Sequence, residues 1–373
     1  MIPKHLFTSL LIFTALAAAS AEDMSKGAYG PVYARRLLAS WDKDSNGSIE
    51  KAEFQQWRLY GRSDANRDDS LSLEELSKVT VPTLVSKGEQ KLNVLYKKTA
   101  EEDLYLDLYY PEKRSASKLP IVIYTHGGGW TTGSKQNIAF GAFPEVHLKL
   151  LDAGFAVAAV NYRLWKPEGS VAIRDCVTDA KDAIRYLSKN SAALGLDPAR
   201  VFVHGDSAGG HIAQMLLLSS PASLPGDPSL AAAPYRMIAG VSWYGPCDFE
   251  KPELFNAEGS EGARDRFGPR ILKPGTNPKD QLTLYREMSP VQYLSPTNPP
   301  LLMIQGDKDT TIPVKHALHM QEQAKIAKSP VEVIIVKNAG HNWREAGGTI
   351  DPGIDQIVTS TVKFLTERLK AIR

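Results

Sequence analysis

From residue 91 onward the chain alternates short apolar runs with longer segments of helical periodicity, and this alternation restricts the possible fold most strongly. Several of the runs are apolar almost throughout, as expected for strands of a parallel sheet that is buried on both faces. Such an order predicts an α/β domain with helices on both faces of a mostly parallel sheet. We expect strands at 91–99, 103–110, 121–125, 156–161, 201–204, 238–243, 301–304 and 331–336, and helices at 172–189, 210–218, 314–327 and 355–371.

The composition excludes several classes of protein. Among 373 residues, 44 Lys plus Arg stand against 42 Asp plus Glu, so the formal net charge is only +2. A nucleic-acid-binding protein is expected to show a basic excess or a basic stripe, and neither is present. Hydrophobic residues make up 43% of the chain and charged residues 23%, which is typical of a globular protein. Cys176 and Cys247 allow at most one disulfide bridge and no disulfide framework.

The first 21 residues have the pattern of a secretory signal peptide. Lys4 and His5 give a basic start, residues 6–18 are almost wholly apolar, and residues 19–21 are the small residues of a cleavage site. The apolar run is shorter than the ~20 residues that a membrane-spanning helix needs. We therefore expect cleavage near Ala21 and a secreted or periplasmic protein without a membrane span.

Residues 29–80 contain two copies of the EF-hand loop pattern D-x-[DN]-x-[DN]-G-x5-E. The copy at 42–53 matches at every position. The copy at 64–75 has Asp69 at its sixth position, where glycine reaches a left-handed conformation at lower cost. Because both copies carry a bulky apolar residue at position eight, we expect a small all-α EF-hand pair that binds calcium, more weakly in the second loop.

Each loop supplies the hard oxygen ligands that Ca²⁺ prefers, and its final glutamate supplies both carboxylate oxygens. The loop starts are 22 residues apart, so one helix at about 51–60 is expected to leave the first loop and enter the second. The alternative is that these acidic runs are ordinary solvated loops. The predicted ligands are Asp42, Asp44, Asn46, Ser48, Glu50 and Glu53 in the first loop, and Asp64, Asn66, Asp68, Ser70, Ser72 and Glu75 in the second.

Within the α/β region, residues 205–209 read G-x-S-x-G between a predicted strand and a predicted helix. A turn this tight requires small flanking residues, and it lifts the hydroxyl of Ser207 to the N-terminus of the helix as a nucleophile. A simple glycine turn is the alternative reading of the pattern. The strand-turn-helix context favours the nucleophile.

The acid and the base of a catalytic triad are expected after the nucleophile, in the order Ser, Asp, His. Asp309 lies three residues past a strand-ending glycine, with Asp307 as the alternative acid, and His341 follows the last predicted strand. A glycine run at 127–129 allows backbone N–H groups to approach a developing oxyanion. The predicted oxyanion donors are the N–H groups of Gly127, Gly128 and Ala208.

Together these motifs resemble those of the α/β-hydrolase esterase and lipase superfamily, near its hormone-sensitive-lipase-like and bacterial feruloyl-esterase-like carboxylesterases. The resemblance covers residues 91–373 and implies ester hydrolysis through an acyl-enzyme on Ser207, without a metal. The fold usually carries a lid or specificity insertion where residues 248–299 stand. The motif around the predicted acid lacks the DPL sequence of strict hormone-sensitive-lipase relatives. This difference favours a resemblance to the feruloyl-esterase-like and acetyl-esterase-like members. The motifs are HGGGW at 126–130, GDSAGGH at 205–211, GDKDTTIP at 306–313 and AGH at 339–341.

The sequence therefore predicts a secreted serine carboxylic-ester hydrolase, with a linker at 81–90 joining the EF-hand pair to the hydrolase domain at 91–373. The expected substrates are short-chain, aryl or carbohydrate-linked acyl esters, either small or attached to a polysaccharide, and no nucleic acid is expected as a partner. Calcium would be structural or regulatory, and the EF-hand pair would be able to dock to a surface or matrix. Two alternatives stay open: an amide or formamide hydrolase of kynurenine-formamidase type, and a calcium-dependent binding protein.

Overall fold

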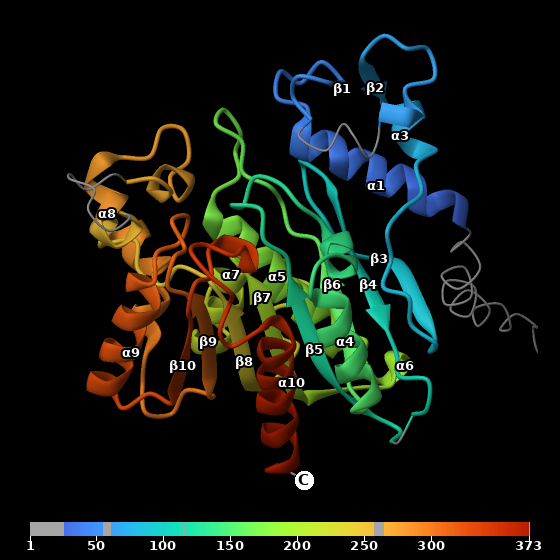
Figure 1. Cartoon of the computed structure of the whole chain (residues 1–373). Helices are drawn as coiled ribbons and strands as arrows, with labels where there is room; N and C mark the ends of the chain where they lie inside the picture. The colour runs from blue at the N-terminus through green and yellow to red at the C-terminus, as the bar shows by residue number, and fades with distance from the viewer. Residues whose placement is uncertain (1–25, 55–60, 115, 257–264, 373) are drawn as a thin grey trace, which may run out of the picture. The chain divides into compact units, whose positions relative to one another are not determined.

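The computed structural model divides the chain into two compact units, residues 1–81 and 82–373, which are described separately. The predicted signal peptide at 1–21 lies outside the described residues, as does most of the helix predicted at about 51–60. The residues described are 26–54, 61–114, 116–256 and 265–372 (Figure 1).

The first unit is organised around a short antiparallel pair between its two loops. Strand β1 (Ser48–Glu50) pairs with β2 (Ser70–Ser72), and Ile49 stands opposite Leu71. Both of these position-eight side chains are fully buried, so they hold the loops together through apolar contact. The same core contains Tyr33, Ala34, Leu37, Phe54 and Leu76. The other elements among the described residues of this unit are α1 (Lys26–Trp41), η1 (Gly61–Ser63) and α3 (Leu73–Ser77).

The second unit contains an eight-stranded sheet in the order β10-β9-β8-β7-β5-β6-β4-β3 (Figure 1). Strand β4 pairs antiparallel with β3 and β6, and the other neighbouring strands are parallel. All eight predicted strands are present, and the mostly parallel sheet is confirmed. The strands are β3 (Gln90–Lys98), β4 (Asp103–Tyr109), β5 (Leu119–Thr125), β6 (Ala156–Val160), β7 (Leu196–Asp206), β8 (Met237–Trp243), β9 (Leu301–Gly306) and β10 (Val331–Val336).

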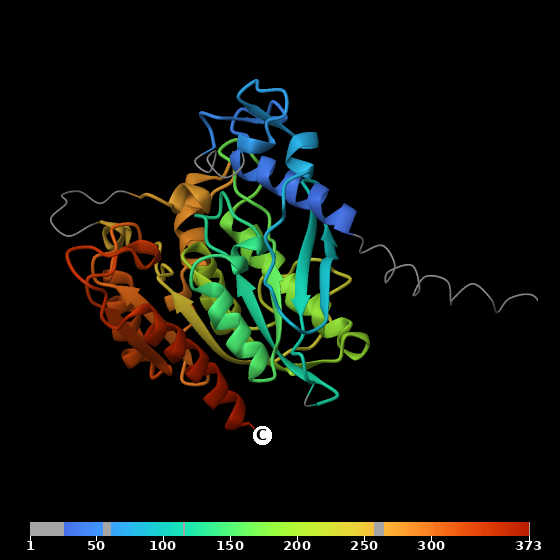
Figure 2. The same ribbon diagram turned by 45° about the vertical axis from the view of Figure 1, so that its right-hand side comes forward.

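Helices cover both faces of this sheet (Figures 1 and 2). Helix α4 (Phe143–Asp152) contacts α10 (Ile354–Lys370) on one face, and α5 (Ile173–Lys189) contacts α7 (Ala208–Leu218) on the other. Helix α9 (Lys315–Ala327) packs against β9 and β10. The four predicted helices are present. The sequence analysis did not predict α4, a helix of 10 residues.

Between β8 and β9 the chain makes a long excursion that includes the segment predicted as a lid or specificity insertion. The described residues of the excursion form four 3-10 turns and the short helix α8 (Gln281–Glu287), and in Figure 1 α8 lies beyond the ends of the strands. Both cysteines are buried and free. No helix in the described ranges is both long enough and apolar enough to cross a membrane. The shorter elements of this unit are α6 (Ser191–Leu194), η2 (Lys135–Ala139), η3 (Pro252–Phe255), η4 (Gly268–Arg270), η5 (Pro278–Asp280), η6 (Pro290–Tyr293) and η7 (His341–Trp343).

Candidate active site and metal loops

Ser207 occupies a strained turn between β7 and α7. Its backbone has φ 51° and ψ −119°, a conformation that costs a non-glycine residue roughly 1–3 kcal/mol. The turn has no room for larger neighbours. A Cβ on Gly205 would lie 2.2 Å from the carbonyl oxygen of Gly209, and a Cβ on Gly209 would lie 2.0 Å from the carbonyl oxygen of Thr125. The two glycines therefore allow the turn that presents the Ser207 hydroxyl at the N-terminus of α7.

His341 and Asp309 reach Ser207 from the loops that follow β10 and β9. His341 Nε2 lies 3.1 Å from Ser207 Oγ, and His341 Nδ1 lies 2.7 Å from Asp309 Oδ2. This geometry fits a neutral imidazole that donates its Nδ1–H to Asp309 and accepts the hydroxyl proton of Ser207 at Nε2. The structure thus brings together the three residues predicted as a triad.

Asp309, and not Asp307, is the carboxylate that contacts His341. The Asp309 side chain is fully buried, and the Asp307 side chain is 29% exposed. Asp309 Oδ1 accepts the N–H groups of Thr311 at 2.8 Å and Ile312 at 2.9 Å. These hydrogen bonds fix the carboxylate, so that its other oxygen is aimed at the imidazole.

The glycine-rich loop after β5 differs from the prediction at one position. The N–H of Gly127 donates to Asp206 Oδ1 at 3.0 Å. The prediction that this N–H is an oxyanion donor is therefore wrong, because the group is already engaged. Gly128 has φ +117°, a conformation that favours glycine, and it stays a candidate donor. Ala208 also stays a candidate, because it is the first residue of α7 and the first N–H groups of a helix have no partner within the helix.

Asp206 links the nucleophile turn to the glycine-rich loop, a role that the sequence analysis did not identify. Its buried carboxylate accepts the Tyr124 hydroxyl at 3.0 Å as well as the N–H of Gly127. Among the described residues no cation forms an ion pair with it. Burial raises the pKa of Asp206 to about 6, although both hydrogen bonds oppose this shift. The motif GDSAGG contains this residue, but the motif gives no indication of which group its carboxylate contacts.

The far end of the glycine-rich loop is held by a buried ion pair. Lys135 Nζ lies 2.7 Å from Asp107 Oδ1, and both side chains are fully buried. The backbone N–H of Lys135 donates to Asn161 Oδ1 at 2.7 Å. The loop is thereby attached to β4 and to the end of β6, so both of its ends are fixed.

In the first unit, the two predicted calcium loops repeat one pattern of hydrogen bonds. The opening aspartate accepts the N–H groups of the fifth and sixth loop residues, at 3.1 and 3.0 Å for Asp42 and at 3.2 and 3.1 Å for Asp64. The closing glutamate accepts those of the second and ninth residues, at 3.0 and 3.3 Å for Glu53 and at 2.8 and 3.0 Å for Glu75. Asp69 has φ 58°, so it adopts the left-handed conformation that its position requires.

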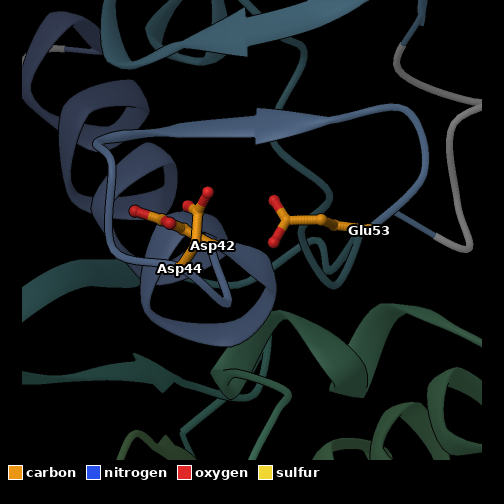
Figure 3. Close-up of side chains that lie close together, drawn as sticks. All are labelled: Asp42, Asp44 and Glu53. Atoms are coloured by element: carbon orange, nitrogen blue, oxygen red, sulfur yellow. The ribbon is translucent and has the colours of Figure 1, made fainter.

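The acidic side chains of the first loop converge. Carboxylate oxygens of Asp42, Asp44 and Glu53 all lie within 4.8 Å of one another, with Glu53 facing the two aspartates (Figure 3). The side chains of Asn46 and Ser48 both donate to Glu50 Oε1, at 2.8 and 3.0 Å. This donor set consists of oxygen atoms and fits a hard divalent cation such as Ca²⁺. In the second loop, Asn66 Nδ2 donates to Asp68 Oδ2 at 2.9 Å, the N–H of Ser70 donates to Asp68 Oδ1 at 2.9 Å, and the Ser72 hydroxyl donates to Glu75 Oε2 at 2.7 Å.

The fold and the Ser207 site define the α/β-hydrolase class to which esterases belong. Residues 106–324, more than half of the chain, match the family model described as BD-FAE, and the chain belongs to that family. It is 27% identical over 238 residues to the probable carboxylic ester hydrolase LipM of Mycobacterium tuberculosis, across 61% of this chain and 50% of LipM. It is also 27% identical over 273 residues to the isoprenylcysteine alpha-carbonyl methylesterase ICME of Arabidopsis thaliana, across 70% of this chain and 58% of ICME.

Solved structures show the same fold. Esterase Est2 of Thermogutta terrifontis with bound propionate has a TM-score of 0.58 and 25% identity, across 78% of this chain and 96% of Est2. A truncated carbohydrate esterase from gut microbiota has a TM-score of 0.57 and 21% identity, across 78% of this chain and 99% of that chain. These matches confirm the predicted fold, and the family match together with the named ester hydrolases supports the predicted enzyme class, carboxylic ester hydrolase. The chain spans only 50% of the length of LipM and 58% of the length of ICME. The activity of the whole protein is therefore proposed below.

The buried charge of Asp206 predicts a pH-dependent stability. The pKa of Asp206 in the folded state is about 6, above the usual 3.8. The contribution of this side chain to the free energy of unfolding is therefore fully present below about pH 4 and is lost as the pH rises through about 6. Relative to Asp206→Asn, the wild-type free energy of unfolding is expected to fall by up to about 3 kcal/mol between about pH 4 and 7. Urea denaturation of both proteins across that range measures the difference, and a constant difference would contradict the buried charge.

Proposed function

We propose that this protein is an exported serine hydrolase that cleaves carboxylic esters through a Ser207–His341–Asp309 triad. The observation that carries the proposal is the continuous hydrogen-bonded chain from Asp309 Oδ2 through the imidazole of His341 to Ser207 Oγ. Membership of the BD-FAE family and the similarity to named ester hydrolases support it.

In this mechanism His341 Nε2 accepts the proton of the Ser207 hydroxyl while Oγ attacks the ester carbonyl carbon. Asp309 holds the imidazole in the required tautomer and stabilises its protonated form. The N–H groups of Gly128 and Ala208 donate to the oxyanion of the tetrahedral intermediate, where loss of one donor typically costs about 10²–10³ in rate. His341 then gives its proton to the departing alcohol, and the acyl group stays on Ser207.

The second half of the reaction releases the acid. His341 removes a proton from water, and the resulting hydroxide attacks the acyl carbon on Ser207. Collapse of the second intermediate releases a carboxylic acid and returns the proton to Oγ. Each turnover therefore consumes one ester and one water and yields one acid and one alcohol, and no step requires a metal.

For substrates, we propose short-chain, aryl or carbohydrate-linked acyl esters. Among the similar structures, Est2 was solved with bound propionate, and a second protein, from gut microbiota, is named a carbohydrate esterase. An N-formyl aromatic amide is the substrate of the competing formamide-hydrolase hypothesis, because the same triad cleaves amides. Export of the protein rests on the sequence pattern of residues 1–21. Docking through the first unit likewise stays a prediction from the sequence.

Replacement of Ser207 by alanine tests the nucleophile. Hydrolysis of acetyl, butyryl, octanoyl and feruloyl esters and of a formanilide is measured for wild type and Ser207→Ala. We expect ester turnover in the wild type and a loss of kcat/KM of at least about 10⁴-fold in the variant. Ser220→Ala, beyond the other end of α7, is the matched control with unchanged rates. Turnover of the formanilide alone would favour the formamide hydrolase, and turnover of no substrate would favour a binding protein.

We further propose that the loops at 42–53 and 64–75 bind Ca²⁺ as a structural or regulatory ion. Support comes from the converging carboxylates of the first loop, and from the opening aspartate and closing glutamate, which accept N–H groups at the same positions in both loops. Asp42, Asp44, Asn46 and Glu53 would hold the ion through side-chain oxygens and Ser48 through its carbonyl oxygen. The ion would neutralise the clustered negative charge and take no part in ester hydrolysis.

Calcium titration calorimetry on the full-length, chelator-treated protein tests this assignment. The wild-type protein is expected to bind two Ca²⁺ ions, with a higher affinity in the loop at 42–53 than in the loop at 64–75. Glu53→Gln and Glu75→Gln should each weaken their own site at least about tenfold, and Asp69→Gly should strengthen the second site by relieving its backbone strain. Glu74→Gln is the matched control, because Glu74 is exposed and pairs with Lys78. Unchanged binding in Glu53→Gln would contradict the site.

A further inference from the structure

Two arginines of the excursion between β8 and β9 contact the loops that carry the proposed catalytic groups. Arg270 donates from Nη1 to the carbonyl oxygen of Gly129 at 2.7 Å, next to the candidate oxyanion donor. Arg266 donates from Nη1 to the carbonyl oxygens of Thr310 at 3.0 Å and Thr311 at 3.3 Å, in the loop of the triad acid. One short segment, residues 265–270, thus touches two sides of the site.

An aromatic surface orients both guanidinium groups. The Cζ atoms of Arg270 and Arg266 lie 4.9 and 5.3 Å from the centroid of the Phe267 ring, and Arg270 Cζ also lies 5.7 Å from that of Trp165. Phe267 is itself fixed, since its ring packs against that of Trp130 at 5.8 Å. Cations are attracted to such ring faces, and the contact leaves the edge of the guanidinium plane available for hydrogen bonds.

Neither arginine has an acidic partner among the residues that the structure describes. The carboxylate of Asp265, beside them in sequence, accepts the N–H of Gly268 and the hydroxyl of Tyr285. By contrast, Arg286 of the same excursion pairs with Glu250 at 2.9 Å. Arg270 is half-buried, and burial together with the charge of Arg266 lowers its pKa. An anion stabilises a half-buried cation. A guanidinium also presents five N–H donors, and a single carbonyl oxygen cannot occupy all of them.

We propose that Arg270, with Arg266 beside it, binds a carboxylate of the ester substrate, so that the enzyme prefers esters whose acyl or alcohol part carries an acid group. Uronic acid derivatives and half-esters of dicarboxylic acids belong to this class. The proposal rests on the proposed ester hydrolase function and deepens it. Arginine suits this task because its planar fork matches both oxygens of a carboxylate.

The test compares two matched pairs of esters. For a carboxylate on the acyl side, 4-nitrophenyl hemisuccinate is compared with 4-nitrophenyl butyrate, and for the alcohol side, 4-carboxyphenyl acetate is compared with phenyl acetate. The readout is the ratio of kcat/KM for the charged ester to that for the neutral ester. Because each variant is compared with the wild type on the same esters, differences in leaving-group reactivity cancel.

In Arg270→Met we expect this ratio to fall roughly tenfold or more in at least one pair, mainly through KM. Arg270→Lys should keep part of the preference, and Arg286→Met, the matched control, should keep all of it. Equal loss on charged and neutral esters would show that Arg270 only positions the Gly129 loop and would overturn the proposal. An unchanged ratio would also overturn it. If wild type hydrolyses none of the four esters, the proposed function itself fails.

Discussion

The tight turn at Ser207 is the constraint on which the rest of the site depends. It places a non-glycine residue at φ 51° between a central strand and a helix, and it leaves no space for a side chain at Gly205 or Gly209. The strand β7 is paired on both sides, with β5 and β8, so the turn cannot relax without disturbing the middle of the sheet. The buried sheet thus supplies the rigidity that keeps the strained serine in place.

The loops around this turn are held by buried polar groups. Asp206 fixes the start of the glycine-rich loop through Gly127, and the Lys135–Asp107 pair fixes its end. Removing one member of such a pair leaves an uncompensated charge in the interior. These groups position the backbone N–H groups that face the oxyanion in the proposed mechanism.

The sequence allowed the sheet to be predicted, and it also pointed to the three residues of the proposed triad, because apolar runs and strand-end motifs are local signals. The contact from Gly127 to Asp206 joins residues 79 apart in the chain, and nothing local distinguishes an engaged N–H from a free one. Arg270 was missed for the same reason, since its contact with Gly129 spans 141 residues. The pairing of Ile49 with Leu71 fits the calcium-loop pattern, which places a bulky apolar residue at position eight of each loop.

The central claim is that Ser207 is a nucleophile activated by His341, and covalent trapping tests it most directly. The protein is treated with a fluorophosphonate ester, and the site of the adduct is found by mass spectrometry of its peptides. We predict one phosphonyl group on Ser207, formed much more slowly in His341→Ala and absent in Ser207→Ala. Labelling of another residue, or equal labelling rates with and without His341, would contradict the account.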